Sequence, residues 1–182
     1  MPEQSFFVDI DSYQQKKDGQ NTYGDYIKSQ RYTDEGRLLA VLSDGLGSGI
    51  KANILATMTS TMILKFLEEG KDILKASEVI MNSLPVCQVR KISYATFSAF
   101  ECMDDGNIRI VEEGNPDFIH IRNGKVLEHE PRVLRKNSQT ATCTCISLNS
   151  NQRTDLFFAR TVSLRQAWEQ MSTNWAGEER GL

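Results

Sequence analysis

The sequence predicts an α+β fold, in which two helices lie between groups of mostly antiparallel strands. Apolar residues recur every three to four positions from residue 50 to residue 84, which is the period of amphipathic helices. Short apolar or alternating segments lie on both sides of this region, and several are joined by turns typical of hairpins. A chain of 182 residues is long enough for one domain with a full core.

Three strands are predicted before the helical region. Ser5 to Ile10 forms the first, and a polar loop leads to the second, Tyr23 to Arg31. Residues 33–36 form a turn into the third strand, Leu38 to Leu42. Because the turn is short, we expect the second and third strands to pair as a hairpin.

The helical region divides into two segments. The first begins at Ile50 and ends at Gly70, since glycine commonly stops a helix. The second runs from Lys71 to Leu84 and ends before Pro85. The apolar residues of the first helix lie in two rows, which are Ile50, Ile54, Met58, Met62 and Phe66, and Leu55, Ile63 and Leu67.

The rest of the chain is predicted to be mainly β. Met103 to Gly106 and Arg122 to Gly124 are hairpin turns with strands on either side. The expected strands are, in order, Ser93–Cys102, Asn107–Glu112, Phe118–Ile121, Lys125–Leu127, Ala141–Leu148 and Asp155–Phe158.

The composition is that of an ordinary globular protein, with 40% apolar and 25% charged residues. A net charge of -3 and the lack of a basic cluster with interleaved aromatics argue against nucleic-acid binding. No apolar run is long enough to span a membrane, and Met1 to Ser12 lacks the order of a signal peptide. We therefore expect a cytoplasmic protein with neither nucleic acid nor membrane as a partner.

The cysteines suit reduced thiols better than a disulfide framework, because they are scattered along the chain. Cys143 and Cys145 would share one face of a strand, but two ligands do not make a zinc site. His120 and His129 are too remote in sequence to complete one. The four cysteines are Cys87, Cys102, Cys143 and Cys145.

The strongest functional signal is a glycine-rich turn between the third strand and the first helix, where Asp44 is followed by Gly45, Gly47 and Gly49. A phosphate loop would need Gly-Lys-Ser/Thr at its end, and a dinucleotide fingerprint would need Gly-x-Gly-x-x-Gly. Neither pattern is present. The residues suit a hard cation held by the Asp44 carboxylate and a nearby carbonyl of Gly45. The alternative is a tight turn in which Asp44 only caps the helix.

The sequence resembles the metal-dependent protein phosphatases, specifically the bacterial SpoIIE-like branch, over residues 5–159. Ser43-Asp44-Gly45-Leu46-Gly47-Ser48-Gly49 followed by a helix resembles the family's Asp-Gly motif, and Tyr23-Gly24-Asp25-Tyr26 resembles the Gly-Asp motif before it. Ser93 to Phe97, Asp104 to Gly106 and Glu113 to Pro116 resemble the central hairpin and the Gly-x-Pro turn after it.

This resemblance implies a four-layer αββα sandwich with the metals at one end of two sheets. It also implies hydrolysis of phosphoserine or phosphothreonine on a protein, with paired Mn²⁺ or Mg²⁺ ions activating a water, so that no side-chain nucleophile is needed. Asp25 and Asp44 would be ligands with the carbonyl of Gly45, and Gly24, Gly47 and Gly49 would shape the site. The implied partner is a phosphorylated anti-sigma antagonist or a similar regulator.

The resemblance stops near residue 159, which divides the chain into an incomplete SpoIIE-like domain (1–159) and a divergent tail (160–182). Where the family has a further Ser-Asp-Gly, this chain has Ala159-Arg160-Thr161. Codons chosen for residues 160–172 encode Asp-Gly-Val-Ser when read two nucleotides later, so a frameshift would explain the break. The alternative is a genuine amphipathic helix, with Leu164, Trp168, Met171 and Trp175 at helical spacing.

Charge limits the phosphatase interpretation. Paired divalent ions carry four positive charges, whereas Asp25 and Asp44 are the two carboxylates identified to hold them. Asp117 and Asp155 are the nearest further candidates. A second hypothesis is therefore a catalytically silent, phosphatase-like binding module. A third, a small nucleotide-binding protein, is disfavoured because both phosphate-loop patterns fail.

Overall fold

The computed structural model describes residues 8–14, 16, 18–19, 21–84, 94–123, 125–136, 139–148 and 154–158. The elements in these residues are, in chain order, β1 (Asp25–Tyr32), the 3₁₀ turn η1 (Thr33–Glu35), β2 (Arg37–Gly45), α1 (Gly49–Glu68), α2 (Ile73–Ser83), β3 (Ala95–Met103), β4 (Asn107–Glu113), β5 (Ile119–Arg122), β6 (Lys125–Leu127), β7 (Arg132–Lys136), β8 (Gln139–Ser147) and β9 (Thr154–Phe157).

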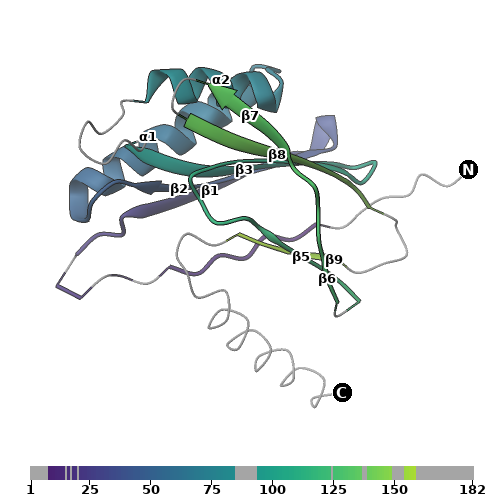
Figure 1. Cartoon of the computed structure of the whole chain (residues 1–182), viewed down its shortest axis with the longest axis horizontal. Coiled ribbons are helices and arrows are strands. Elements are labelled where there is room, and N and C mark those ends of the chain that lie inside the picture. Colours follow the sequence, from purple (N-terminus) through teal and green to yellow (C-terminus); the bar gives the residue numbers. More distant parts are fainter. Residues whose placement is uncertain are drawn as a thin grey trace, which may run out of the picture.

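The strands form two antiparallel sheets. The larger sheet has the strand order β1-β2-β3-β4-β8-β7, and the smaller has the order β6-β5-β9. Helices α1 and α2 cover one face of the large sheet, and the small sheet lies on its opposite side (Figure 1). The described residues therefore form three layers, and the predicted α+β class is confirmed.

Two cores separate these layers, and strand β2 contributes to both. Leu39 and Val41 face the helices, where they join Ile63 and Leu67 of α1. The alternate residues Leu38 and Ala40 face the small sheet instead, as the two-residue period of a strand requires. Aromatic rings fill much of the second core. The ring centroid of Phe158 lies 5.9 Å from that of Phe100 and 5.8 Å from that of Phe118.

Helix α1 buries a different face from the one that its large apolar residues suggest. Ile50, Ile54 and Met58 are exposed by 68%, 51% and 55%. The buried residues of the helix are Ala52, Ala56, Thr59, Ser60, Ile63, Leu64 and Leu67. Small residues near the start allow the helix to approach the sheet, and this close approach determines which face is buried.

The predicted hairpin of the second and third strands is confirmed, because β1 and β2 pair along their full lengths. The end of the first helix is confirmed as well, since Gly70 has a φ of 71° just after α1. Two predictions differ from the structure. Strand β7 was not expected, and residues 8–10 are irregular where a strand was predicted. Residues 5–7 of that predicted strand lie outside the described residues.

The cysteines within the described residues are free thiols, with Cys102 and Cys143 buried and Cys145 exposed. Cys87 lies outside the described residues. Burial raises the pKa of the Cys102 thiol to about 11, which keeps it protonated at neutral pH. The three cysteines within the described residues agree with the expectation of reduced thiols.

Candidate metal centre

The candidate centre is the end of β1 and β2 that carries Asp25 and Asp44. The register of the two strands places these residues directly opposite each other, so their Cβ atoms are about 4.5–5.5 Å apart on one face. Asp44 is in phase with Leu38 and Ala40, and it therefore lies on the face of the large sheet that is turned toward the small sheet. Both side chains are half-buried.

Four glycines shape the backbone around these carboxylates. The Gly45 N–H donates to the Gly24 carbonyl at 3.1 Å, which ties the ends of the two strands together. A Cβ on Gly45 would lie 1.9 Å from the backbone oxygen of Ala52, so no larger residue fits against the first turn of α1. Gly47 and Gly49 have φ values of 108° and 68°, which favour glycine. Strand β2 includes Asp44 and Gly45, so the turn itself is shorter than predicted.

Strand β3 adds Thr96 to this edge, because its register places Thr96 directly opposite Asp44. The Thr96 hydroxyl donates to Oδ1 of Asn115 at 2.5 Å. The Asn115 amide in turn donates to Oγ of Ser98 at 2.9 Å, and the Ser98 hydroxyl donates to Oε1 of Glu112 at 3.1 Å. A chain of hydrogen bonds thus leads from beside Asp44 to Glu112.

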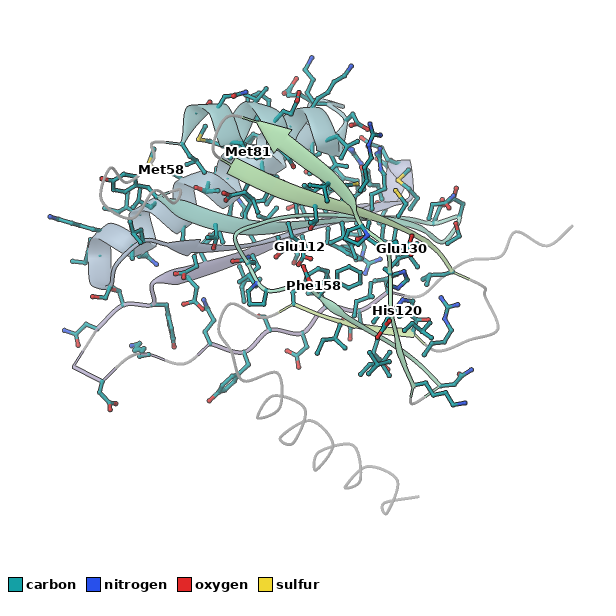
Figure 2. All side chains as sticks on the ribbon, viewed as in Figure 1. Met58, Met81, Glu112, His120, Glu130 and Phe158 are labelled. Carbon is teal, nitrogen blue, oxygen red and sulfur yellow. The ribbon has the colours of Figure 1, made fainter. Side chains whose placement is uncertain are left out.

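Glu112 ends this chain between the two sheets, as Figure 2 shows. Its other oxygen, Oε2, accepts from the Phe118 N–H at 3.2 Å. Burial raises the pKa of Glu112 to about 7, and the nearby Asp117 charge contributes in the same direction. A cavity of about 300 Å³ opens beside Glu112. The described residues that line it include Asp117 and Glu128 but no lysine or arginine, and these acidic groups would repel an anionic phosphate.

Sequence reasoning did not identify Thr96, Ser98, Glu112 or Asn115 as neighbours of the centre. A signal for two of them was present in strand β3. Thr96 and Ser98 are polar, yet they alternate in phase with Phe100 and Cys102, which belong to the core between the sheets. Polar residues on a core-facing row of a strand indicate a hydrogen-bond network or a site.

The donors at the centre suit a hard divalent cation, because carboxylate and carbonyl oxygens are the ligands that Mg²⁺ and Mn²⁺ prefer. Asp25 and Asp44 balance the charge of one such ion. Throughout the part of the chain that the structure describes, no group of three or more His, Cys, Asp or Glu side chains is placed to hold a metal. Asp117 lies beside Glu112, and Asp155 is on β9 opposite Ile121. The described donors therefore fit one ion better than two.

The two histidines, which are remote in sequence from Cys143 and Cys145, are in contact with each other in the structure. Nδ1 of His120 is 2.6 Å from Nε2 of His129. Burial lowers the pKa of His120 to about 4, and the neighbouring His129 and Arg122 add to the effect. His120 is therefore a neutral core residue of the small sheet at physiological pH. Figure 2 shows it on that sheet.

A family model described as stage II sporulation protein E (SpoIIE) matches residues 34–135, which is more than half of the chain. No curated protein sequence matches the chain significantly. Among the described residues, neither α1 nor α2 has the length and apolar character needed to cross a membrane.

Solved structures with the same fold support this match. The PP2C phosphatase domain of SpoIIE from Bacillus subtilis, solved with a fragment of its regulatory domain, is 20% identical with a TM-score of 0.61, over 75% of this chain and 40% of that one. RsbX in complex with magnesium is 20% identical with a TM-score of 0.54, over 72% and 65% of the two chains.

A third structure contains the RsbU and RsbW domains of a Mycobacterium tuberculosis protein. It is 18% identical with a TM-score of 0.57, over 73% of this chain and 38% of that one. At these identities the likeness shows a common fold. The chain spans less than two thirds of the length of each of the three structures.

Proposed function

Because the chain belongs to the SpoIIE-like branch of the metal-dependent (PPM, type 2C) protein phosphatases, we propose that it hydrolyses phosphoserine or phosphothreonine on a regulatory protein. The observation that carries the proposal is the register of β1 and β2, which sets Asp25 directly opposite Asp44 at the end of the sheet. Carboxylate oxygens brought together in this way are the ligands that a hard divalent cation prefers, so we propose a cation as the ligand.

In this proposal Asp25, Asp44 and the carbonyl of Gly45 hold Mn²⁺ or Mg²⁺. The cation supplies a Lewis acid that activates water and stabilises charge on the phosphoryl oxygens. The chain's own contribution is to fix these oxygens in place. Gly24 and Gly45 hold the ends of the two strands together, and Gly47 and Gly49 turn the backbone into α1.

The substrate follows from the family rather than from the geometry. We propose a phosphorylated anti-sigma antagonist or a related signalling protein. The free cysteines among the described residues suit a reducing compartment, so we also propose a cytoplasmic location. Neither a nucleic acid nor a membrane is part of the proposal.

We propose that residues 1–159 form the phosphatase domain and that residues 160–182 are a divergent tail produced by a shifted reading frame. These last residues lie outside the described part of the chain. The test is the nucleotide sequence of the gene through codon 160. Codons that cannot encode Asp-Gly in a shifted frame would exclude the frameshift explanation.

The activity is tested with a phosphoserine peptide and MnCl₂, comparing the wild-type chain with Asp44→Asn and Asp25→Asn. Asp34→Asn is the matched control, because Asp34 is an exposed residue of η1, at the other end of the hairpin. We expect phosphate release that requires manganese and is lost in the first two variants but not in the control. Release that persists in both Asp44→Asn and Asp25→Asn would contradict the proposal.

The second candidate function is a catalytically silent, phosphatase-like binding module. It is favoured by one observation, the lack of a group of three potential metal ligands within the described ranges. A folded wild-type chain that binds the phosphopeptide but releases no phosphate at any manganese concentration would support this candidate against the first.

A further inference from the structure

The hydrogen bonds that start at Thr96 all run in one direction. Thr96 donates to Asn115, Asn115 donates to Ser98, and Ser98 donates to Glu112. The Asn115 amide fixes this direction, because its Oδ1 can only accept, from Thr96, and its Nδ2 can only donate, to Ser98. Bonds aligned in this way polarise and strengthen one another.

Thr96 is also held in one rotamer by its surroundings. The Ser43 hydroxyl donates to the Thr96 carbonyl at 2.7 Å and fixes the backbone. A Cβ on Gly114, which has a φ of 70°, would lie 2.6 Å from the Thr96 methyl carbon. The methyl group therefore lies against Gly114, and the hydroxyl proton is committed to Asn115. The oxygen of the Thr96 hydroxyl can still accept a hydrogen bond. Thr96 is half-buried and lies opposite Asp44.

We infer that Thr96 accepts a hydrogen bond from a water molecule bound beside Asp44 and thereby orients it. This inference rests on the function proposed above and identifies the residue that would aim the attacking water. Thr96 does not take the proton of that water, because a neutral hydroxyl oxygen is too weak a base. Asn115 is a positioning residue, since it acts only by holding the Thr96 hydroxyl as an acceptor.

The test compares Thr96→Val, which removes the hydroxyl but keeps the shape, with Thr96→Ser, which keeps the hydroxyl. Thr144→Val is the matched control, because Thr144 is a buried threonine on the same face of the large sheet, on β8. Loss of one orienting hydrogen bond should lower kcat about tenfold in Thr96→Val, with KM for the phosphoserine peptide unchanged. Thr96→Ser and Thr144→Val should keep most of the wild-type kcat.

Fluoride provides a readout that needs no turnover. Fluoride can replace a water on a metal ion, but it only accepts hydrogen bonds, so the acceptor side of Thr96 should repel it. In Mn²⁺-loaded protein, measured by calorimetry, we expect fluoride affinity to increase from the wild-type chain to Thr96→Val. It should increase further in Asn115→Ala, where the Thr96 hydroxyl can rotate and donate to fluoride. The Mn²⁺ affinity itself should not change.

Phosphate release tests the proposed function, and the fluoride affinities test the role of Thr96. A wild-type chain that releases no phosphate but shows this order of fluoride affinities would contradict the proposed function and support the role of Thr96. Equal fluoride affinities in all three proteins would overturn that role, whatever the activity. The role would also be overturned if Thr96→Ser lost as much kcat as Thr96→Val, since packing would then explain the effect.

Discussion

The two ends of strand β2 differ in the charged residues that they bring together. At its start, the buried Arg37 guanidinium donates to the Leu67 carbonyl at 3.0 Å and lies 3.6 Å from Glu101. Glu101 also accepts from Arg109, which pairs in turn with Asp72 at the start of α2. Positive and negative groups alternate here, and they attach both helices to the sheet.

At its end, β2 places Asp44 opposite a second carboxylate, Asp25. Like charges on directly opposite residues destabilise a sheet. This contrast indicates which end of the strand carries a function. Groups of opposite charge are interleaved where the layers must be held together, and groups of like charge are brought together where a ligand of the other sign is expected.

The largest effect is expected at the Arg37 end. Glu101 is 2% exposed and lies between two arginines. Glu101→Gln should lower the free energy of unfolding by about 3 kcal/mol, because it removes the buried carboxylate that lies between the two guanidinium groups. Urea unfolding measures the change. Arg37→Met combined with Glu101→Leu should recover much of the loss, and a double variant as unstable as the sum of its single variants would contradict this interpretation.

A smaller loss is expected where α1 meets the other end of β2. Gly45→Ala places a Cβ against the Ala52 backbone oxygen, so the helix must shift. We expect a loss of about 2–3 kcal/mol in the free energy of unfolding, as for other overpacked sites. Gly19→Ala is a suitable control, because nothing lies within 4 Å of the Gly19 Cβ position, so its loss reflects only the positive φ of that residue. Equal losses in both variants would argue against the close approach of α1.

A third prediction concerns Glu113, which faces the helix layer beside Phe97 and Ala141. Burial raises its pKa from 4.5 to about 7. A raised carboxyl pKa means that the unfolded chain loses its proton first, so the contribution of Glu113 to stability is greatest below pH 4.5 and falls as the pH rises toward 7. Glu112 titrates in the same window.

Glu113→Gln should remove its share of this pH dependence, which is on the order of 2 kcal/mol between pH 5 and pH 8. The measurement is the free energy of unfolding in urea at both pH values. The exposed Glu130, which Figure 2 labels, provides the control variant Glu130→Gln. A Glu113→Gln chain with the full wild-type pH dependence would show that Glu113 is ionised in the folded protein.

The smallest effect should have the opposite sign. In metal-free protein, Asp44→Asn removes one of two opposed carboxylates, and we expect a gain of about 0.5 kcal/mol in the free energy of unfolding. Asp25→Asn should behave in the same way. A loss of more than about 1 kcal/mol in either variant would mean that the carboxylate has a structural role like that of Glu101.

Local patterns in the sequence were enough to predict the order of most elements and the pairing of the two strands that carry Asp25 and Asp44. Two strands joined by a turn as short as residues 33–36 pair with each other as a hairpin, and the length of the turn determines which residues are opposite. The family resemblance implied four layers, and the described residues form three of them: the helices, the large sheet and the small sheet. Both inferences depend on residues that are close in sequence.

Features that depend on contacts between distant segments were not predicted. The buried face of α1 is decided by Ala52 packing against Gly45, and an apolar row such as Ile50, Ile54 and Met58 looks like a core until that contact is known. The hydrogen bonds from Thr96 to Glu112 require the register of β3 with β4 and the turn at Asn115. Neither the buried face of α1 nor these hydrogen bonds can be predicted from the spacing of residues in the sequence.

The most direct test of the central claim is the stabilisation of the folded chain by Mn²⁺. Binding to the folded state alone raises the free energy of unfolding by about 2.7 kcal/mol at a hundred times the dissociation constant. Urea unfolding with and without MnCl₂ should show such a gain in the wild-type chain, little or none in Asp44→Asn and Asp25→Asn, and the full gain in Asp34→Asn. Equal stabilisation of the wild-type chain and Asp44→Asn, or none in either, would contradict a cation site at this end of β2.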